Sequence, residues 1–299
     1  SRVKRAMLIV NPFSTSVTRR LVEDVEDALR QQVELETEYT KAKGHATELA
    51  ARAAEEADAV VVLSGDGTYN EAINGAGGRI PMGFLPGGGT SVFPRALGLP
   101  RDAYVAAEAV AYAIAIGRTR RITLGRVNGR RFAFSAGIGL DAEAVRRMDA
   151  RGRTEDGKRP GDFAFAATFL RLFTEARLRF EPALEITGVG RAAFVMVANG
   201  SPYSFAGPVP LQIVPEANFE EGLAFVAPVA VRPAVLPRLA TRALRGRLHE
   251  DAVVLAGHDE DRIEVHCDRP LPLQADGEDL GDVLEATFEA ERGALEVLI

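Results

Sequence analysis

Residues 59–71 read AVVVLSGDGTYNE, an apolar run that is followed by a glycine turn and then by the start of a helix. The unbroken apolar run predicts a strand buried on both faces, as in a parallel sheet. Gly65 and Gly67 lack a Cβ, so a ligand can approach their backbone closely. We expect Thr68 to cap the helix, whose free N–H groups favour phosphate. Taken alone, a Gly-x-Gly turn is equally typical of a βα connection without a ligand.

Two more polar turns follow predicted strands. Strand 6–10 leads into Asn11-Pro12-Phe13-Ser14, and the apolar stretch 80–85 leads into Pro86 and the glycine run 87–89. Ligands of open parallel sheets bind at the carboxyl ends of strands, so we expect the three turns to form one site for a polyanion. Phosphate repels a carboxylate, and Asp66 therefore indicates a Mg²⁺ ion, a ribose or backbone N–H groups nearby.

The order of predicted elements indicates two domains. Up to about residue 120, strands alternate with helices, which predicts a parallel sheet covered on both faces. Helical faces run through 21–29 and 49–57, and a third helix, 101–116, has Asp102 near its start and Gly117 after its end. We therefore expect an α/β domain over residues 1–120.

The remainder is expected to be a mainly antiparallel β domain over residues 121–288. Asn128-Gly129 predicts a hairpin turn between strands 122–127 and 131–135. Further strands are expected at 183–187, 192–198, 211–214, 222–227, 262–266, 271–275 and 283–288. Two helices are expected near 161–180 and 233–247, and 146–160 is expected to be a polar loop.

Composition narrows the function classes. The 299 residues are 46% hydrophobic, which suits a globular core, and the net charge of −6 argues against a nucleic-acid-binding protein. The single cysteine, Cys267, suits a reducing compartment. No apolar run reaches the roughly 18 residues needed to cross a membrane, and the amino end has no signal-peptide pattern. We expect a cytoplasmic protein.

The motif Ser64–Glu71 resembles the Gly-Gly-Asp-Gly-Thr-x-x-Glu signature of the diacylglycerol kinase catalytic domain family. That family includes sphingosine kinases and soluble bacterial lipid kinases. Other segments resemble the family's motifs in the same order along nearly the whole chain. They are 11–14, Thr40 with 44–46, 86–100, 136–142, 198–200, 214–223 and 275–278.

The resemblance implies a Rossmann-like nucleotide domain, a mainly antiparallel β-sandwich domain and a C-terminal segment, 289–299, that returns to the first domain. It implies that ATP and Mg²⁺ are cofactors and that a lipid hydroxyl, of diacylglycerol or a related alcohol, is phosphorylated in a cleft between the domains. The residues matching the family's nucleotide site are Asn11, Ser14, Thr40, Ser64, Gly65, Asp66, Gly67, Thr68, Glu71, Gly88, Gly89 and Thr90.

Family members also suggest roles for acidic residues. Asp276 matches the general base of bacterial members. Without the resemblance, Asp276-Gly277-Glu278 would be more typical of an ordinary hairpin loop with solvated acids. Sphingosine kinases are thought to use the aspartate of the glycine turn, here Asp66. We expect Asp276 to be the base and Asp66 to organise nucleotide and Mg²⁺. Glu221 and Glu278 match a separate structural metal site.

Several departures from the family pattern leave alternatives open. Ser91-Val92 stands where an Asn-Asp pair is usual, Ala224 replaces an aspartate, and Glu220-Glu221 replaces two aspartates. An inactive nucleotide- or lipid-binding protein therefore remains an alternative. An NAD kinase shares the Gly-Asp-Gly-Thr turn, but Asn70-Glu71 directly after it argues against that enzyme.

Two helices could contact lipid. Phenylalanines in 161–180 could line an acyl-chain pocket, although ordinary core packing explains them better. Arg238, Arg242 and Arg245 share one face of helix 233–247 and predict either a solvated surface or a transient, peripheral contact with anionic membrane. The sequence leaves the oligomeric state open, with a homodimer as one option.

Overall fold

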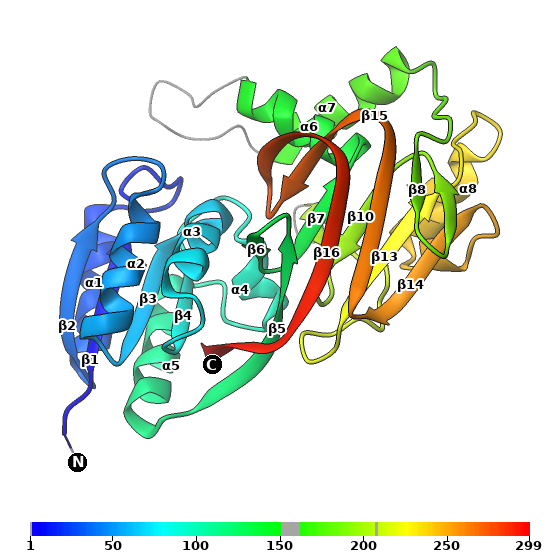
Figure 1. The fold of residues 1–299 in the computed structure, drawn as a ribbon. Helices are drawn as coiled ribbons and strands as arrows, with labels where there is room; N and C mark the ends of the chain where they lie inside the picture. The colour runs from blue at the N-terminus through cyan, green and yellow to red at the C-terminus, as the bar shows by residue number, and fades with distance from the viewer. Residues whose placement is uncertain (1, 151–161, 207–208) are drawn as a thin grey trace. The chain divides into compact units, whose positions relative to one another are not determined.

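The computed structural model describes residues 2–150, 162–206 and 209–299, although for 162–166 and for Ala206 and Val209 it describes the backbone alone. The described chain divides into two compact units. Unit 1 contains the residues up to Ile122 and the segment Gly293–Ile299, and unit 2 contains those from Thr123 to Arg292. Figure 1 shows the elements of both units.

Unit 1 is built on a parallel sheet with strand order β2-β1-β3-β4. Beside β4, the last strand of the chain adds a parallel pairing between Val297 and Met82. The alternation of strands and helices predicted for residues 1–120 is confirmed (Figure 1). The elements are β1 Arg5–Val10, α1 Arg19–Arg30, β2 Glu34–Tyr39, α2 His45–Glu56, β3 Ala59–Ser64, α3 Asp66–Ala76, β4 Met82–Pro86, α4 Val92–Ala96 and α5 Ala103–Ile116.

Packing in unit 1 follows the apolar periodicity. Every residue of β3 is buried, as expected for a strand covered on both faces. Helices α1 and α5 share one core with alternate residues of β1 such as Leu8 and Val10. Helices α2 and α3 approach so closely that a Cβ at Gly75 would lie 2.1 Å from the carbonyl oxygen of Thr47.

The ends of α5 agree with the sequence-based prediction, whereas the start of α3 differs from it. Asp102 caps α5 by accepting from the N–H of Val105, and Gly117 ends it in the left-handed conformation. The prediction that Thr68 caps its helix is wrong. Helix α3 begins at Asp66, and Gly65 is the N-cap residue, so Thr68 lies inside the first turn.

Unit 2 is mainly antiparallel, as predicted. Its principal sheet has the order β14-β13-β10-β7-β15-β16, with hairpin β8–β9 paired to β15 and hairpin β5–β6 next to β16. The strands are β5 Thr119–Val127, β6 Arg130–Phe132, β7 Ser135–Ile138, β8 Leu184–Ile186, β9 Gly190–Ala192, β10 Val195–Ala198, β11 Ser204–Ala206, β12 Val209–Leu211, β13 Leu223–Pro228, β14 Val254–Glu260, β15 Arg262–Ala275 and β16 Glu278–Leu298.

Both faces of this sheet are buried, which explains why β13 is a continuous apolar run. Leu223, Phe225 and Ala227 point into a core formed among the strands. The alternate residues Ala224 and Val226 belong to a second core that includes helix side chains. The helical elements of unit 2 are α6 Leu140–Ala150, α7 Asp162–Glu175, α8 Leu236–Leu244 and the 3-10 turn Leu248–Glu250.

Several predicted boundaries in unit 2 are wrong. The expected strand 192–198 is divided between β9 and β10. The expected strands 262–266 and 271–275 form one strand, because an irregular register between His266 and Leu271 accommodates the intervening residues. Residues 146–150 of the expected polar loop belong to α6, and 151–160 lie outside the described residues.

The second predicted arm of the first hairpin is also shared between two strands. Arg131 and Phe132 pair in β6, whereas Ser135 begins β7, which pairs with β10 and β15.

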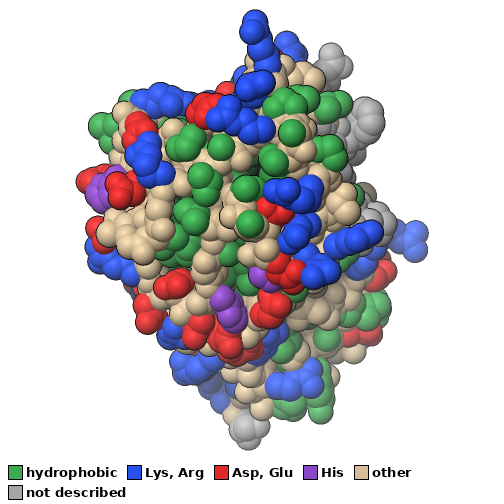
Figure 2. All heavy atoms as spheres, turned by 90° about the vertical axis from the view of Figure 1, so that its right-hand side faces the viewer, with side chains coloured by type: hydrophobic (Ala, Val, Ile, Leu, Met, Phe, Trp, Pro, Cys, Tyr) green, Lys and Arg blue, Asp and Glu red, His purple; other side chains and the backbone are tan. Residues whose placement is uncertain are grey.

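Figure 2 shows the side of the molecule that carries α8 and β14 in Figure 1, with exposed hydrophobic side chains surrounded by charged ones. Within the described part of the chain, no helix is long and apolar enough to cross a membrane.

Candidate active site

The carboxyl ends of β1, β3 and β4 are neighbours in the parallel sheet, so the three predicted turns meet. The hydroxyl oxygens of Ser14 and Ser64 lie 2.8 Å apart, which joins the turns after β1 and β3. Asn11 Nδ2 donates to Thr68 Oγ1 at 3.2 Å. Four predicted nucleotide residues from distant parts of the sequence are therefore brought together. Their binding of a nucleotide stays a prediction.

The glycine turns after β3 and β4 touch each other. The N–H of Gly87 donates to the carbonyl of Ser64 at 2.7 Å. A Cβ at Gly88 would lie 2.8 Å from the Cα of Gly65, so packing alone requires glycine at 88. A Cβ at Gly67 or Gly89 would meet nothing within 4 Å. Packing therefore does not explain the glycines at 67 and 89, which suits close approach by a ligand.

Asp66 binds backbone. Its carboxylate accepts from the N–H groups of Val92 at 2.8 Å and Phe93 at 3.0 Å, the first two residues of α4. The sequence indicates a Mg²⁺ ion, a ribose or backbone N–H groups near Asp66, and the structure shows backbone N–H groups. A role of Asp66 in binding Mg²⁺ stays a prediction.

Sequence reasoning did not assign a role to Tyr69. Its buried hydroxyl lies 2.8 Å from the carbonyl oxygen of Ser64 and 2.6 Å from that of Leu85. Burial, and secondly the negative charge of Asp66, raises the pKa of Tyr69 well above its ordinary value. Tyr69 therefore remains protonated and can donate a hydrogen bond that joins the ends of β3 and β4. An aromatic residue two positions after the second glycine of the turn was the only available signal.

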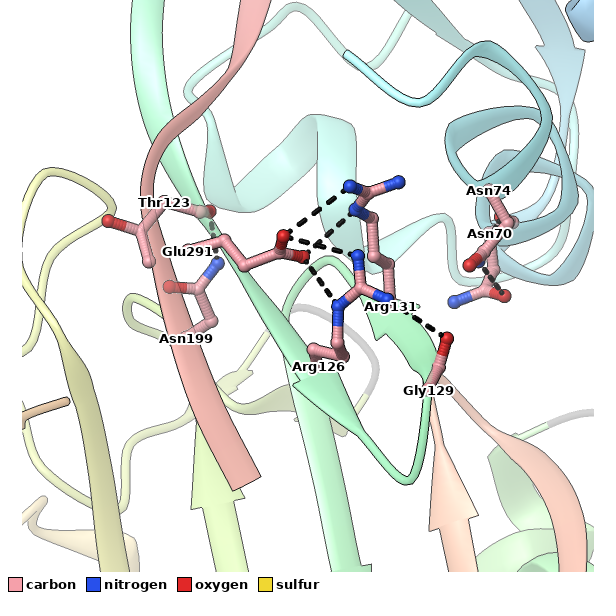
Figure 3. Close-up of polar contacts among 8 residues, drawn as sticks. All are labelled: Asn70, Asn74, Thr123, Arg126, Gly129, Arg131, Asn199 and Glu291. Atoms are coloured by element: carbon pink, nitrogen blue, oxygen red, sulfur yellow. Dashed lines mark hydrogen bonds and ion pairs between the residues drawn. The ribbon is translucent and has the colours of Figure 1, made fainter. Parts of the chain in front are cut away.

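The other predicted residues of unit 1 lie around this region of the sheet. Glu71 Oε1 accepts from the N–H of Gly44 at 3.0 Å, which connects α3 to the start of α2. Thr40 is buried, and its N–H donates to the carbonyl of Val10 at 2.9 Å. In Figure 3, Asn74 donates to the backbone and side-chain oxygens of Asn70, a buried residue of the same motif. Thr90 follows Gly89 in the turn after β4.

In unit 2, Asp276 and Gly277 form a two-residue turn between β15 and β16. Both have positive φ, 49° and 78°, as the tight hairpin turn requires. The expected hairpin is confirmed, but Asp276 is only 3% exposed, so the alternative of a solvated acid is wrong. Its carboxylate accepts from the N–H groups of Ala133 at 2.6 Å, Phe134 at 3.0 Å and Ser135 at 3.1 Å. Three donors fix its orientation.

Asn199 supports the segment that holds Asp276. Its Nδ2 donates to the carbonyl oxygen of Thr123 at 2.6 Å (Figure 3). The same Nδ2 donates to the carbonyl oxygen of Ala133 at 2.7 Å. Its N–H donates to the carbonyl of Phe134 at 2.9 Å. Because the same segment donates to Asp276, Asn199 positions the donors. The resemblance identified the motif 198–200 without indicating this role.

A charged cluster lies on the neighbouring hairpin. Arg126 and Arg131, paired across β5 and β6, both contact Glu291 of β16, with Nε to Oε1 distances of 3.2 Å and 2.9 Å (Figure 3). Burial acts to raise the pKa of Glu291, but hydrogen bonds from the two guanidinium groups outweigh it and lower the pKa. Sequence reasoning missed this cluster because its members lie about 160 positions apart.

A buried polar network reaches the Asp276 turn. Tyr203 donates to Asp141 Oδ2 at 2.5 Å, and Gln274 Nε2 donates to the same oxygen at 3.0 Å. Gln274 Oε1 accepts from the N–H of Gly277 at 3.0 Å. Burial raises the pKa of Asp141, although these hydrogen bonds oppose the shift. A Cβ at Gly137 would lie 2.3 Å from Asp141 Oδ2, so the network needs glycine there.

The residues matched to a structural metal site have other partners. Glu278 forms an ion pair with Arg130 at 2.6 Å, and Glu221 Oε2 lies 2.8 Å from His258 Nε2. Among the described residues, no three His, Cys, Asp or Glu side chains are grouped to hold a metal. The assignment of Glu221 and Glu278 to a metal stays a prediction.

The described aromatic residues of α7 contribute to a core. Phe169 and Phe173 pack against the core that contains Leu172 and Tyr203, which agrees with the core-packing interpretation. Leu170 is 66% exposed. The side chains of Phe163 and Phe165 lie outside the described residues.

The parallel-sheet unit with its glycine turns and the antiparallel unit with its buried hairpin aspartate define a two-part, kinase-like class of protein. Residues 5–127 match the model of the diacylglycerol kinase catalytic domain, and 135–299 match that of the YegS C-terminal NAD kinase beta sandwich-like domain. The chain belongs to the diacylglycerol kinase family, and its second part is a β-sandwich-like domain.

Curated relatives agree with this family. The chain is 28% identical over 301 aligned positions to a diacylglycerol kinase of Bacillus subtilis, covering 96% of this chain and 93% of the relative. It is 27% identical to a diacylglycerol kinase of Staphylococcus carnosus, covering 95% and 92% of the two chains.

Solved structures show the same fold. A diacylglycerol kinase from Bacillus anthracis aligns with a TM-score of 0.73 at 20% identity, covering 100% of this chain and 97% of the other. An NAD kinase from Archaeoglobus fulgidus, solved in complex with ATP, aligns with a TM-score of 0.54 at 15% identity, covering 98% and 93%. At these identities the likeness concerns the fold.

Proposed function

We propose that this protein transfers the γ-phosphoryl group of ATP to the hydroxyl of a lipid alcohol, diacylglycerol or a close relative. The observation that carries the proposal is the buried carboxylate of Asp276, which three backbone N–H groups hold in one orientation. A buried and oriented carboxylate in a kinase family is suited to accept a proton. The names of the curated relatives support the choice of acceptor.

In the proposal, unit 1 binds ATP. The meeting turns provide backbone N–H groups at Gly67 and Gly89, where a Cβ would have free space, and hydroxyls at Ser14, Ser64 and Thr68. Oriented N–H groups at a helix start favour phosphate. The NAD kinase that shares this fold was solved in complex with ATP. That complex supports the proposal that unit 1 binds a nucleotide.

Mg²⁺ would neutralise phosphate charge when bound. Its known preference is for phosphate oxygens and water with one or two carboxylates, so the absence of an acidic cluster among the described side chains is compatible with it. Asp66 would supply the single carboxylate, because it lies in the glycine turn at the start of α3 and the backbone of α4 orients its two oxygens. Asp66 also orders the turn that would contact the nucleotide.

The proposed chemistry needs one proton acceptor. The lipid hydroxyl oxygen forms a bond to the γ-phosphorus while its proton passes to the Asp276 carboxylate. The bond between the γ-phosphorus and the β,γ-bridging oxygen breaks, which releases ADP and leaves a lipid phosphomonoester. Positioning and charge neutralisation contribute most to such transfers, and a placed base adds about 10²–10⁴-fold.

A substrate panel tests the proposal. Purified protein is incubated with ATP, Mg²⁺ and diacylglycerol, other lipid alcohols or NAD, and the phosphorylated product is identified by mass spectrometry. The proposal expects a lipid phosphomonoester. Phosphorylated NAD as the main product would establish the NAD kinase alternative, and ATP binding without turnover of any acceptor would establish an inactive binding protein.

The Asp276→Asn variant tests the base. Its amide NH₂ group would face one of the three N–H donors, so we expect a loss of about 1–3 kcal/mol in unfolding free energy as well as loss of transfer. Stabilisation by ATP separates the loss of stability from the loss of transfer. A folded variant that lacks only the base still binds ATP, so ATP still stabilises it against unfolding. The control is Asp268→Asn, since Asp268 forms a surface ion pair with Arg191. Unchanged turnover in Asp276→Asn would reject the base.

A further inference from the structure

Helix α8 and the turn after it form a basic segment in an acidic protein. Residues 232–249 contain five arginines and no acidic residue, whereas the chain has a net charge of −6. Four of these arginines, together with Pro237 and Thr241, line a surface cavity of about 440 Å³. They are Arg238, Arg242, Arg245 and Arg247.

Two carboxylates partly neutralise this cavity. Arg238 and Arg242 share one oxygen of Asp251, at 2.9 Å and 3.1 Å, and the Asp251 side chain is 1% exposed. Arg247 pairs with Glu250 at 2.7 Å. Arg245 is exposed and forms no ion pair with a described residue. The cavity therefore keeps a surplus of two positive charges.

The shared ion pair fixes part of this surface. Asp251 also accepts from the N–H of Val253, so both its oxygens are held. Leu239 on the same helix is buried and anchors α8 to the core. Arg238 and Arg242 are thus presented in fixed positions. A rigid array of guanidinium groups suits the phosphate groups of phospholipids.

An apolar side chain lies on the exposed surface of the same helix. Leu244 is 74% exposed, the most exposed among the large hydrophobic residues that the structure describes. It directly precedes Arg245, and exposed hydrophobic side chains are visible on this side of the molecule in Figure 2. An amphipathic helix with arginines and an exposed leucine is typical of a surface that lies on anionic lipid.

We infer that α8 and its arginine-lined cavity dock the protein on an anionic phospholipid bilayer, with Arg245 and Leu244 as the principal contacts. The inference rests on the proposed function, because a kinase with a lipid acceptor must reach the bilayer that contains it. The charge surplus selects anionic phosphate groups over neutral lipid. The exposed Leu244 selects a bilayer over a soluble phosphate, since a dissolved anion gives this side chain no apolar surface.

The test is sedimentation of the full chain with vesicles of phosphatidylglycerol and phosphatidylcholine, or of phosphatidylcholine alone, without ATP. We expect binding to the anionic vesicles that weakens with added salt. Arg245→Gln should weaken it about fivefold, the usual contribution of one basic residue at such a surface, and adding Leu244→Gln should weaken it further. Arg238 and Arg242 are left unchanged because they stabilise buried Asp251.

The matched control is Arg269→Gln, which removes an exposed arginine of β15 in the same unit. All variants should phosphorylate a dissolved short-chain diacylglycerol at the wild-type rate. Equal vesicle binding by Arg245→Gln and wild type would overturn the docking surface. Displacement by inorganic phosphate at constant ionic strength would also overturn it, in favour of a soluble anion.

The two proposals can fail separately. Vesicle binding that depends on Arg245, without phosphorylation of any lipid, would reject the kinase proposal and keep the docking surface. Phosphorylation of lipid combined with vesicle binding that is indifferent to Arg245 would do the reverse.

Discussion

Gln274 Nε2 donates to Asp141 Oδ2 at 3.0 Å inside unit 2. The carbonyl oxygen of the same side chain accepts from the N–H of Gly277 at 3.0 Å. Gln274 thereby connects a buried acid on α6 to the turn that presents Asp276. Both groups of the amide are used, which also fixes its orientation.

We expect Gln274→Met to destabilise the protein and to slow transfer. The thioether keeps most of the volume but leaves the Gly277 N–H without its acceptor and Asp141 without one donor, at a cost of about 1–3 kcal/mol in unfolding free energy. The less constrained turn should lower kcat. The KM for ATP should stay near the wild-type value, because the predicted nucleotide residues belong to unit 1. Denaturant unfolding and steady-state kinetics measure these effects.

The matched control for this prediction is Gln32→Met, which changes an exposed glutamine after α1. A rise in the KM for ATP without a change in kcat would contradict the positioning role of Gln274.

Asp141 should make stability depend on pH. Its folded-state pKa is raised by burial above the ordinary carboxyl value of about 3.9. Between the unfolded-state pKa and the raised folded-state pKa, the folded state binds more protons than the unfolded state. The stabilisation that comes from protonated Asp141 is therefore complete below about pH 4 and is lost as the pH rises through the raised pKa. Asp141→Asn removes the titration, and its stability deficit relative to wild type should shrink as the pH rises.

Denaturant unfolding of wild type and Asp141→Asn across the acidic range measures that difference. Comparing the two proteins cancels the other carboxylates, such as Glu291, whose lowered pKa acts in the opposite direction. A deficit that grows with pH over this range would disprove the raised pKa.

Neighbouring glycines in the turn after β4 should respond differently to alanine. At Gly88 the new Cβ would lie 2.8 Å from the Cα of Gly65, so Gly88→Ala should lose about 1–3 kcal/mol in unfolding free energy. At Gly89 a Cβ would meet nothing within 4 Å, so stability should change by less than about 0.5 kcal/mol. If phosphate approaches the backbone there, Gly89→Ala should still weaken ATP binding.

Calorimetric ATP titration combined with thermal unfolding distinguishes the two glycine variants. Wild-type ATP affinity in a stable Gly89→Ala protein would show that phosphate does not approach the backbone at this position.

Sequence patterns predicted unit 1 well because its signals are local. The continuous apolar run 59–63 indicated a strand covered on both faces, and Asp102 and Gly117 indicated the ends of a helix. Unit 2 was harder to predict because most of its strands are short and many of them pair over long separations in the sequence. The register irregularity after His266 joins two expected strands into one. The sequence pattern predicted two separate strands there, 262–266 and 271–275.

The sequence by itself determined the parallel α/β sheet, the glycine turns at its strand ends, the Asp276-Gly277 hairpin and the family. Only the tertiary structure decided what the acidic residues contact. It buries Asp276 against three backbone N–H groups and places Asp66 where it accepts hydrogen bonds from the start of α4. It also connects Asp141 to the Asp276 turn through Gln274. Periodicity and turn preferences arise from neighbouring residues, whereas the environment of a carboxylate depends on segments that folding brings together from distant positions.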